Sequence, residues 1–175
     1  MGLLDVLARY QSRPNPPPPN VLDDFDRVSN ELTADDLAPG LEDAFNDDDT
    51  PPFEEMVGQL YERSDDDMRA GLMNEIVNSL GGGQALATGA AGGLFGGVLG
   101  DLIRRRQGRE AITARDMHNV PAREIERAAA AAKGQNPNIV QTISRFYARH
   151  PRLVQGLGQA AISILMSGMA RRRRF

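Results

Sequence analysis

The chain has 175 residues, of which 25% are charged, and it contains neither Cys nor Trp. The lack of Cys excludes disulfide bonds and thiolate metal sites, and the length suits one domain or one domain with an appended arm. The net charge of −4 conceals an asymmetry, because residues 1–70 hold 18 acidic and five basic residues whereas residues 71–175 hold six acidic and 15 basic ones. Such halves fold onto one another, pair between copies of the chain, or offer the basic half to an anionic partner.

The first fifty residues predict an extended acidic arm. Apolar residues recur at helical spacing in residues 2–10 and again in residues 20–28. Between them, residues 13–19 contain five prolines and predict a stiff polyproline II spacer, with a proline-recognition motif as the alternative. Residues 33–45 predict a helical stretch that is broken at Pro39-Gly40. Asp47-Asp48-Asp49 then form a solvated charge run, since the Gly and Glu of an EF-hand loop are missing.

Two amphipathic helices are predicted in residues 51–80. Thr50 is expected to cap the first helix, with Pro51 at its first position. Ser64 and Asp67 predict a capping box for the second helix, which Gly81 ends. The expected inward faces are Phe53, Met56, Val57, Leu60 and Tyr61, followed by Met68, Leu72, Met73, Ile76, Val77 and Leu80.

Residues 81–100 (GGGQALATGAAGGLFGGVLG) are dominated by glycine. The glycines recur four apart in two interleaved rows, and on a helix these rows would merge into one stripe without side chains. Each Gly costs about 1 kcal/mol relative to Ala inside a helix, so close packing against another helix would have to compensate. A flexible glycine linker is the alternative. The predicted helix-packing interface consists of Gly89, Gly92, Gly93, Gly96, Gly97 and Gly100.

A membrane hypothesis rests on the same region. No charged residue occurs from Ile76 to Gly100, and this run of 25 residues is long enough to span a bilayer. Glycines and polar residues dilute its hydrophobicity. The hypothesis has residues 84–103 inserted in a membrane or lying on it, with the cluster Arg104, Arg105 and Arg106 on anionic lipid. These arginines equally suit the C-terminal end of a soluble helix.

The C-terminal third predicts a helical subdomain that ends in an arginine tail. Alanine and branched apolar residues recur there at helical spacing, including Ile125, Ala128, Ala129, Ala132, Ile139, Val140, Ile143, Phe146, Tyr147, Leu153, Val154, Leu157, Ile164, Leu165 and Met169. The predicted helix starts are, in order, the Thr113–Asp116 capping box, Pro121 (with Gly134 as its helix end), Asn136-Pro137 and His150-Pro151.

No stretch has a reliable period of two, so the predicted fold class is all-α. We expect a multi-helix bundle with an extended acidic, Pro-rich N-terminal arm. The predicted parts are residues 1–50 (amphipathic helix, proline spacer and acidic arm), residues 51–110 (helical pair plus Gly-rich helix) and residues 111–175 (helical subdomain with the Arg tail).

Residues that could carry chemistry are sparse. His118 and His150 are the only histidines, and neither lies in a cluster with metal-ligand spacing. We therefore expect no metal, no cofactor and no catalytic residue, and a structural hydrogen bond at His150. Nucleic-acid binding is a further hypothesis, because the short helices of residues 113–146 have helix-turn-helix-like spacing. Its basic face would consist of Arg115, Arg123, Arg127, Arg145, Arg149 and Arg152.

Two segments resemble known bacterial sequences. The opening Met1-Gly2-Leu3-Leu4-Asp5 and the Gly-rich apolar middle are similar to the YidB-like proteins, a small helical family of unassigned function. The segment FYARHP at residues 146–151 resembles a pattern that recurs in uncharacterised bacterial proteins. The resemblance implies a helical fold for the middle and C-terminal parts and implies no reaction mechanism.

These features together predict a non-enzymatic assembly protein, a subunit or scaffold of a larger bacterial complex. The glycine stripe would pack against another helix, and complementary charges would add further contacts. Protein partners or self-association are expected and nucleic acid is not. The absence of a secretory signal at the start predicts a cytoplasmic location, with membrane association as the alternative. Contacts with anionic partners are expected at Arg104, Arg105, Arg106, Arg171, Arg172, Arg173 and Arg174.

Overall fold

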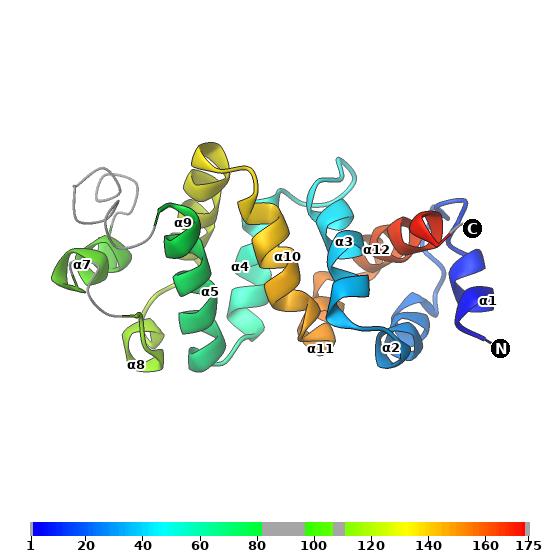
Figure 1. The fold of residues 1–175 in the computed structure, drawn as a ribbon, viewed down its shortest axis with the longest axis horizontal. Coiled ribbons are helices and arrows are strands. Elements are labelled where there is room, and N and C mark those ends of the chain that lie inside the picture. Colours follow the sequence, from blue (N-terminus) through cyan, green and yellow to red (C-terminus); the bar gives the residue numbers. More distant parts are fainter. Residues whose placement is uncertain (1, 82–96, 107–110, 174–175) are drawn as a thin grey trace. The chain divides into compact units, whose positions relative to one another are not determined.

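The computed structural model describes residues 2–81, 97–106 and 111–173, and every regular element in these ranges is a helix (Figure 1). The predicted all-α class is confirmed. The chain divides into two compact units: unit 1 contains Met1–Pro52 and Ser144–Phe175, and unit 2 contains Phe53–Ile143. These units differ from the three consecutive parts expected from the sequence, because the C-terminal helices fold together with the first fifty residues.

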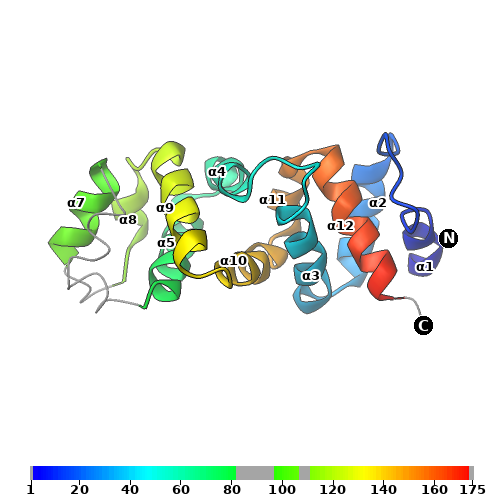
Figure 2. The ribbon, with the colours of Figure 1, turned by 90° about the horizontal axis from the view of Figure 1, so that it is seen from above.

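Unit 1 is built around α12 (Gln159–Arg172), which is buried without interruption from Ala161 to Ala170. A helix that is surrounded by protein needs apolar or small residues on all its faces, and the sequence QAAISILMSGMARR provides them. α1 (Leu3–Ala8), α2 (Val21–Glu31) and α3 (Ala34–Phe45) all pack against α12 (Figure 2). The helical spacing of its apolar residues predicts one buried face, whereas the structure buries every face from Ala161 to Ala170.

The last helix also begins later than predicted. After the end of α10 (Ile139–Ala148), the short α11 (Pro151–Val154) and the 3₁₀ turn η1 (Gln155–Leu157) precede Gly158. Gly158 has a positive φ of 94°, a conformation that suits glycine and that interrupts a right-handed helix. The single helix predicted from Pro151 onward is therefore three elements.

α3 continues through Pro39, where a break was expected. Its start is fixed by Thr33 and Asp36, since the Asp36 N–H donates to the Thr33 hydroxyl at 3.3 Å and the Thr33 N–H donates to the Asp36 carboxylate at 3.1 Å. Packing against α12 compensates for the hydrogen bond that Pro39 cannot donate. Gly40 permits this packing, because a Cβ there would lie only 2.9 Å from the Leu165 carbonyl oxygen.

The first fifty residues fold against α12 and do not extend as an arm. α1 buries Val6 and Leu7 and packs against α2 and α12. Tyr10 is fully buried, and its hydroxyl donates a hydrogen bond to the carboxylate of Asp24 in α2 at 2.7 Å. Docking of this kind is what a helix of six residues requires, since isolated helices of that length are unstable in water.

The proline-rich segment also differs from the straight spacer that was predicted. Arg13 has a positive φ of 52°, which changes the direction of the chain. Pro14 and Pro17 line the same pocket as Ile164 of α12. The segment is therefore part of the packing of unit 1.

Unit 2 has its core between α4 (Phe53–Arg63) and α9 (Ala122–Gln135). α5 (Asp66–Ser79) packs against α8 (Ala114–Met117) and α9, and α7 (Gly97–Arg106) contacts α9. The small side chains on α9 allow α4 to approach closely. The inward faces predicted for α4 and α9 are buried, namely Phe53, Met56, Val57, Leu60, Tyr61, Ile125, Ala128, Ala129 and Ala132.

Polar side chains attach the loops of unit 2 to its helices. The Tyr61 hydroxyl donates to the carbonyl oxygen of Val120 at 2.6 Å. Asn74 of α5 forms two hydrogen bonds with the backbone of Ile112, donating to its carbonyl and accepting from its N–H, each at 2.9 Å. These bonds satisfy backbone groups that have no partner within a helix.

The predicted starts of α8, α9 and α11 agree with the structure, whereas those of α4 and α5 differ. The Thr113–Asp116 box is present, with the Asp116 carboxylate accepting from the Thr113 N–H at 2.8 Å. α4 begins at Phe53, and the Thr50 hydroxyl does not cap it but donates to the carbonyl oxygens of Ala44, in the last turn of α3, and of Asp47. Asp65 caps α5 in place of Ser64, accepting a hydrogen bond from a first-turn N–H at 2.8 Å.

Candidate functional site

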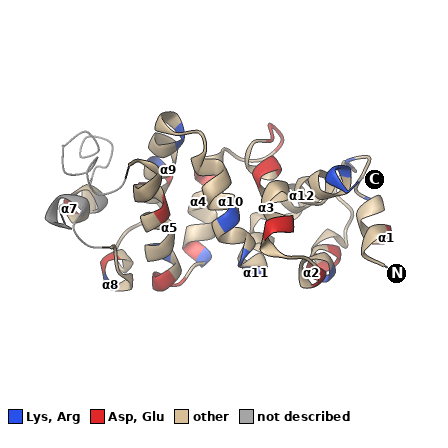
Figure 3. Ribbon diagram, in the orientation of Figure 1, with Lys and Arg blue, Asp and Glu red and all other residues tan. Residues whose placement is uncertain are grey.

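The described arginines of the C-terminal tail pair with carboxylates of the same chain. Arg172 donates two parallel hydrogen bonds to Asp43 of α3, from Nη1 to Oδ2 at 2.6 Å and from Nη2 to Oδ1 at 2.8 Å. Arg173 forms an ion pair with Asp36 at 3.2 Å, and Arg171 lies 4.0 Å from Asp43. Figure 3 shows the basic end of α12 and the acidic residues of α3 that take part. These arginines, predicted to meet an external anion, are engaged within unit 1.

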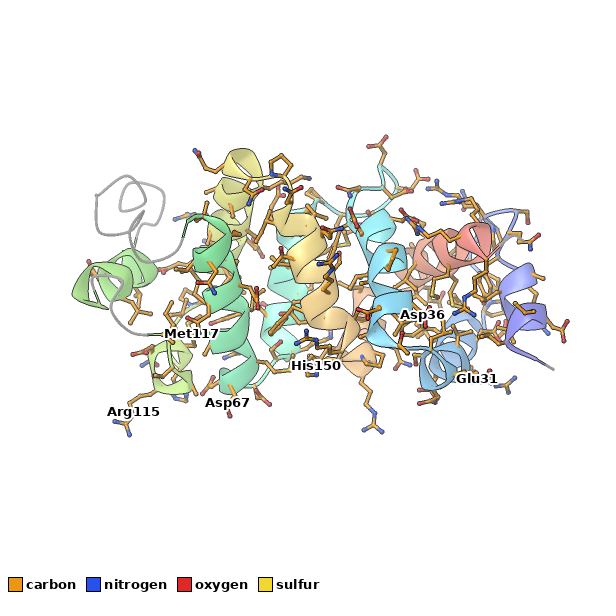
Figure 4. All side chains as sticks on the ribbon, in the orientation of Figure 1. Glu31, Asp36, Asp67, Arg115, Met117 and His150 are labelled. Carbon is orange, nitrogen blue, oxygen red and sulfur yellow. The ribbon has the colours of Figure 1, made fainter. Side chains whose placement is uncertain are left out.

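Asp36 lies in the first turn of α3 (Figure 4), where hydrogen bonds from Thr33 stabilise the charged form of its carboxylate. The Thr33 hydroxyl donates to its carboxylate at 2.8 Å, and the Thr33 N–H donates at 3.1 Å. These two hydrogen bonds, with a smaller contribution from the charge of Arg173, lower the pKa of the Asp36 carboxyl below its ordinary value of 3.8. The carboxylate is therefore charged throughout the neutral pH range.

Folding brings the acidic and basic parts of the sequence into one unit. Met1–Pro52 contain twelve acidic residues and three arginines, and Ser144–Phe175 contain seven arginines and no acidic residue. Their net charges of −9 and +7 combine to −2 in unit 1. Of the three arrangements that the sequence left open, the tail follows the first, in which opposite charges fold onto one another.

The predicted glycine interface is described only at its end. Gly97 is the first residue of α7 and has a positive φ of 64°, so a right-handed helix does not run through it. A Cβ on Gly97 would collide with the side chain of Glu124, which accepts a hydrogen bond from the Val98 N–H at 3.1 Å. Gly100 is buried in α7. The prediction of one continuous helical stripe that reaches Gly100 is therefore wrong at Gly97. Four members lie outside the described residues: Gly89, Gly92, Gly93 and Gly96.

The arginine cluster at residues 104–106 forms the end of α7, and its side chains are outside the described part of the structure. Arg174 is outside the described residues as well. Contact of these arginines with an anionic partner stays a prediction.

Three further arginines of unit 1, which lie close together in the sequence, are exposed and have no partner among the described residues. Arg145 lies on α10, Arg149 lies in the turn that follows, and Arg152 lies on α11. None of their guanidinium groups forms an ion pair or hydrogen bond with another described residue. Phe146 and His150, which alternate with them in sequence, are partly buried with ring centroids 6.0 Å apart. We refer to Arg145, Arg149 and Arg152 as the α10–α11 arginines, and they are the candidate contact for an anionic partner.

The basic face predicted for nucleic acid is divided between the two units. Arg115, Arg123 and Arg127 belong to unit 2, whereas the α10–α11 arginines belong to unit 1. Arg115 projects from the short helix α8 into solvent (Figure 4). Neither unit therefore holds more than three of the six arginines.

The two histidines take part in local contacts. Nδ1 of His118 lies 3.0 Å from the carboxylate of Asp66 at the start of α5, and this hydrogen bond is the main cause of the lowered pKa of Asp66. His150 precedes α11, and its N–H donates to the Tyr147 carbonyl at 2.8 Å. Within the described ranges, no three His, Asp or Glu side chains are grouped so that they could hold a metal ion.

Comparison with known proteins gave no matching family model, no matching curated protein and no matching solved structure. The resemblance to the YidB-like proteins therefore stays a hypothesis. None of the helices in the described part of the chain has both the length and the apolar character needed to cross a membrane.

The glycines that permit close helix packing in unit 1 were missed by the sequence analysis. Gly40 of α3 faces α12, and a Cβ on Gly168 of α12 would collide with the carboxylate of Asp43. Both are isolated glycines and form no stripe. The available signal was the set of small residues near Gly168, where Ser167 and Ala170 are also buried.

Proposed function

We propose that this protein is a non-enzymatic assembly protein that holds an acidic protein partner against the α10–α11 arginines. The observation that carries the proposal is the difference between two groups of arginines within unit 1. Arg171, Arg172 and Arg173 are engaged by Asp36 and Asp43, whereas the α10–α11 arginines have no carboxylate partner among the described residues.

The chemistry of these side chains suits a carboxylate-bearing surface. The guanidinium group is planar, permanently charged and able to donate two parallel hydrogen bonds to one carboxylate. Three such groups on a short segment raise the local positive potential and increase the rate of encounter with an acidic partner. Phe146 and His150 add partly buried ring surface between the charges, and aromatic and Arg side chains are enriched at protein interfaces.

A protein partner is favoured over nucleic acid because the cluster is small. DNA-binding proteins that depend on phosphate contacts commonly make about six to ten of them, and each unit offers at most three of the predicted arginines. Packing of the glycine-rich segment against another helix remains part of the proposal as a second contact. It rests on the sequence spacing of Gly89, Gly92, Gly93 and Gly96.

The test is purification of the tagged full-length protein from its own cells under gentle conditions, with mass measurement and identification of partners by mass spectrometry. One variant carries Arg145→Gln, Arg149→Gln and Arg152→Gln. The matched control carries Arg115→Gln, Arg123→Gln and Arg127→Gln, which removes the same charge from exposed positions of unit 2.

We expect the wild type and the control to recover an acidic protein at a defined ratio and the α10–α11 variant to lose it. A lone 19.0 kDa species from the wild type contradicts the assembly proposal. Retention of the partner by the α10–α11 variant contradicts the assigned contact. If the wild type and the control instead bind duplex DNA or anionic vesicles while the α10–α11 variant does not, the anionic partner is the nucleic acid or the membrane and not a protein.

A further inference from the structure

The outward side of α2 carries carboxylates that have no partner among the described residues. Asp23, Asp26 and Glu31 are exposed, and none of their side chains forms an ion pair or a hydrogen bond with another described residue. The opposite side of the helix anchors it in unit 1, because Phe25 and Val28 are buried there. We refer to Asp23, Asp26 and Glu31 as the α2 carboxylates.

The α2 carboxylates and the α10–α11 arginines lie on neighbouring elements of the same unit. Both groups belong to unit 1, and α11 contacts α2. Figure 3 shows the basic residues of α10 and α11 and the acidic residues of α2. In the described part of the chain, no ion pair joins the two groups. Unit 1 therefore carries a basic patch and an acidic patch close together, and neither patch neutralises the other.

Two neighbouring patches of opposite charge form a surface that is complementary to itself. In a twofold-symmetric dimer both copies use the same surface, so the basic patch of each copy can meet the acidic patch of the other. Each of these two contacts would oppose three arginines to three carboxylates, with Arg27 as one additional positive charge on α2. Unit 1 has a net charge of only −2, so the overall repulsion between two copies is small.

An unrelated acidic partner suits this surface less well than a second copy does. A partner that carries only carboxylates would be attracted by the α10–α11 arginines and repelled by the α2 carboxylates beside them, and like charges in contact disfavour a complex. A second copy offers charges of both signs. With a pI of about 5.2, the chain is also an acidic protein, as the proposed contact requires.

Apolar side chains that are only partly buried lie among the charges of both patches. Phe146 and Leu153 are partly buried next to the α10–α11 arginines in sequence, and Leu22 and Leu32 are partly buried at the two ends of α2. Protein interfaces combine apolar contacts in the centre with polar and charged groups at the rim. In a dimer these side chains would lose contact with water, and the charges would set the orientation of the two copies.

We infer that the α10–α11 arginines of one copy bind the α2 carboxylates of a second copy, and that unit 1 forms a twofold-symmetric dimer in this way. The inference rests on the proposed function and identifies its acidic partner as a second copy of this chain. Because all six charged side chains are exposed, salt screens their attraction, and the affinity of the dimer falls as the ionic strength rises.

The test is sedimentation velocity of the purified full-length protein over a dilution series of about 1–200 μM, at low and at high salt. Two charge-reversal variants remove one patch each. The basic-patch variant carries Arg145→Glu, Arg149→Glu and Arg152→Glu. The acidic-patch variant carries Asp23→Lys, Asp26→Lys and Glu31→Lys. Circular dichroism confirms that each variant is folded.

A matched control reverses three arginines of unit 2 that are equally exposed, namely Arg115→Glu, Arg123→Glu and Arg127→Glu. The decisive sample is an equimolar mixture of the basic-patch and acidic-patch variants. In that mixture each reversed patch meets a patch of opposite charge on the other variant, whereas in either variant alone like charges face each other.

We expect the wild type and the control to form a species of twice the chain mass of 19.0 kDa at low salt. The Kd should rise by about tenfold or more at high salt, because the charges are exposed. Each patch variant alone should be monomeric, with a Kd raised by about a hundredfold or more. The mixture should restore the dimer with one copy of each variant, an outcome that a general loss of folding cannot produce.

A monomeric wild type at low salt, a dimer that survives in either patch variant, or a mixture that stays monomeric would overturn the inference. Failure of this inference is distinguishable from failure of the proposed function. If the wild type is monomeric in sedimentation but recovers a different acidic protein from its own cells, and the α10–α11 variant loses that protein, only the second copy is excluded as the partner. If the wild type is monomeric and recovers no protein, both are wrong.

Discussion

Gly40 of α3 lies directly against the backbone of Leu165 in α12, so close that a Cβ on Gly40 would be 2.9 Å from the Leu165 carbonyl oxygen. A backbone atom in the middle of a buried helix cannot move aside as a flexible side chain can. The contact therefore fixes how near α3 approaches the central helix of unit 1.

Gly40→Ala is expected to destabilise the protein by about 1–3 kcal/mol, the usual cost of overpacking a close contact. Gly134→Ala is the matched control, because Gly134 lies in α9 and a Cβ there meets nothing within 4 Å. This control should stabilise the protein by about 0.5–1 kcal/mol through helix propensity. Urea unfolding measures both changes. Equal effects of the two substitutions would show that α3 and α12 are not in close contact.

The ion pair between Arg172 and Asp43 should contribute a measurable but small coupling energy. Its geometry is bidentate, but the side chains are 45% and 27% exposed, so solvent screens the charges. A double-mutant cycle with Arg172→Ala and Asp43→Asn should give about 0.5–1 kcal/mol at low salt and less at high salt. The asparagine keeps the contact with Gly168. A control cycle with Asp43→Asn and Arg152→Ala should give no coupling energy, because Arg152 has no partner among the described residues.

Asn74 should hold the backbone of Ile112 against α5. Asn74→Ala removes both hydrogen bonds and leaves the N–H and carbonyl of Ile112, a residue only 8% exposed, without these partners. We expect a loss of about 1–3 kcal/mol in the free energy of unfolding and faster hydrogen exchange at the Ile112 amide. Asn78→Ala, at an exposed position of the same helix, should change neither. Unchanged exchange at Ile112 in the Asn74 variant would contradict the described contact.

The stability of the protein should fall as the pH rises above about 10. Burial foremost, together with the hydrogen bond to Asp24, raises the pKa of Tyr10 above its ordinary value of 10.0, and burial also raises the pKa of Tyr61. The folded state therefore keeps these protons when the unfolded state has lost them. The stabilisation is complete below the unfolded pKa and is lost as the pH rises beyond it.

Urea unfolding at a series of alkaline pH values tests this dependence. Tyr10→Phe should reduce the slope of stability against pH, since one of the two groups no longer titrates. The same variant lowers stability at neutral pH, because the buried Asp24 loses the hydroxyl that donates to it at 2.7 Å. A slope that Tyr10→Phe leaves unchanged would contradict the raised pKa of this group.

The sequence predicted those helices that have one polar and one apolar face. The stripe from Phe53 to Tyr61 and the alanine face of α9 have a clear helical period, and both are buried as expected. α12 was predicted less well, because a helix buried on every side has no polar face to mark its period. Its break at Gly158 follows from a backbone conformation that the surrounding apolar pattern does not reveal.

The candidate site was harder to predict because its character depends on distant partners. The tail arginines and the α10–α11 arginines are alike in sequence, and they differ only in whether a carboxylate lies opposite. Arg172 and Asp43 are 129 residues apart, beyond the reach of any local pattern.

Unit 1 is discontinuous in the chain, and this arrangement sets an order for folding during synthesis. Met1–Pro52 leave the ribosome before Phe53–Ile143, whereas the helix around which they pack is made after that whole unit. At about 5–20 residues per second, α12 is completed about 6–25 s after α3. Met1–Pro52 carry twelve acidic residues and three arginines, and a net charge of this size favours solubility of the nascent segment while its apolar faces are still uncovered.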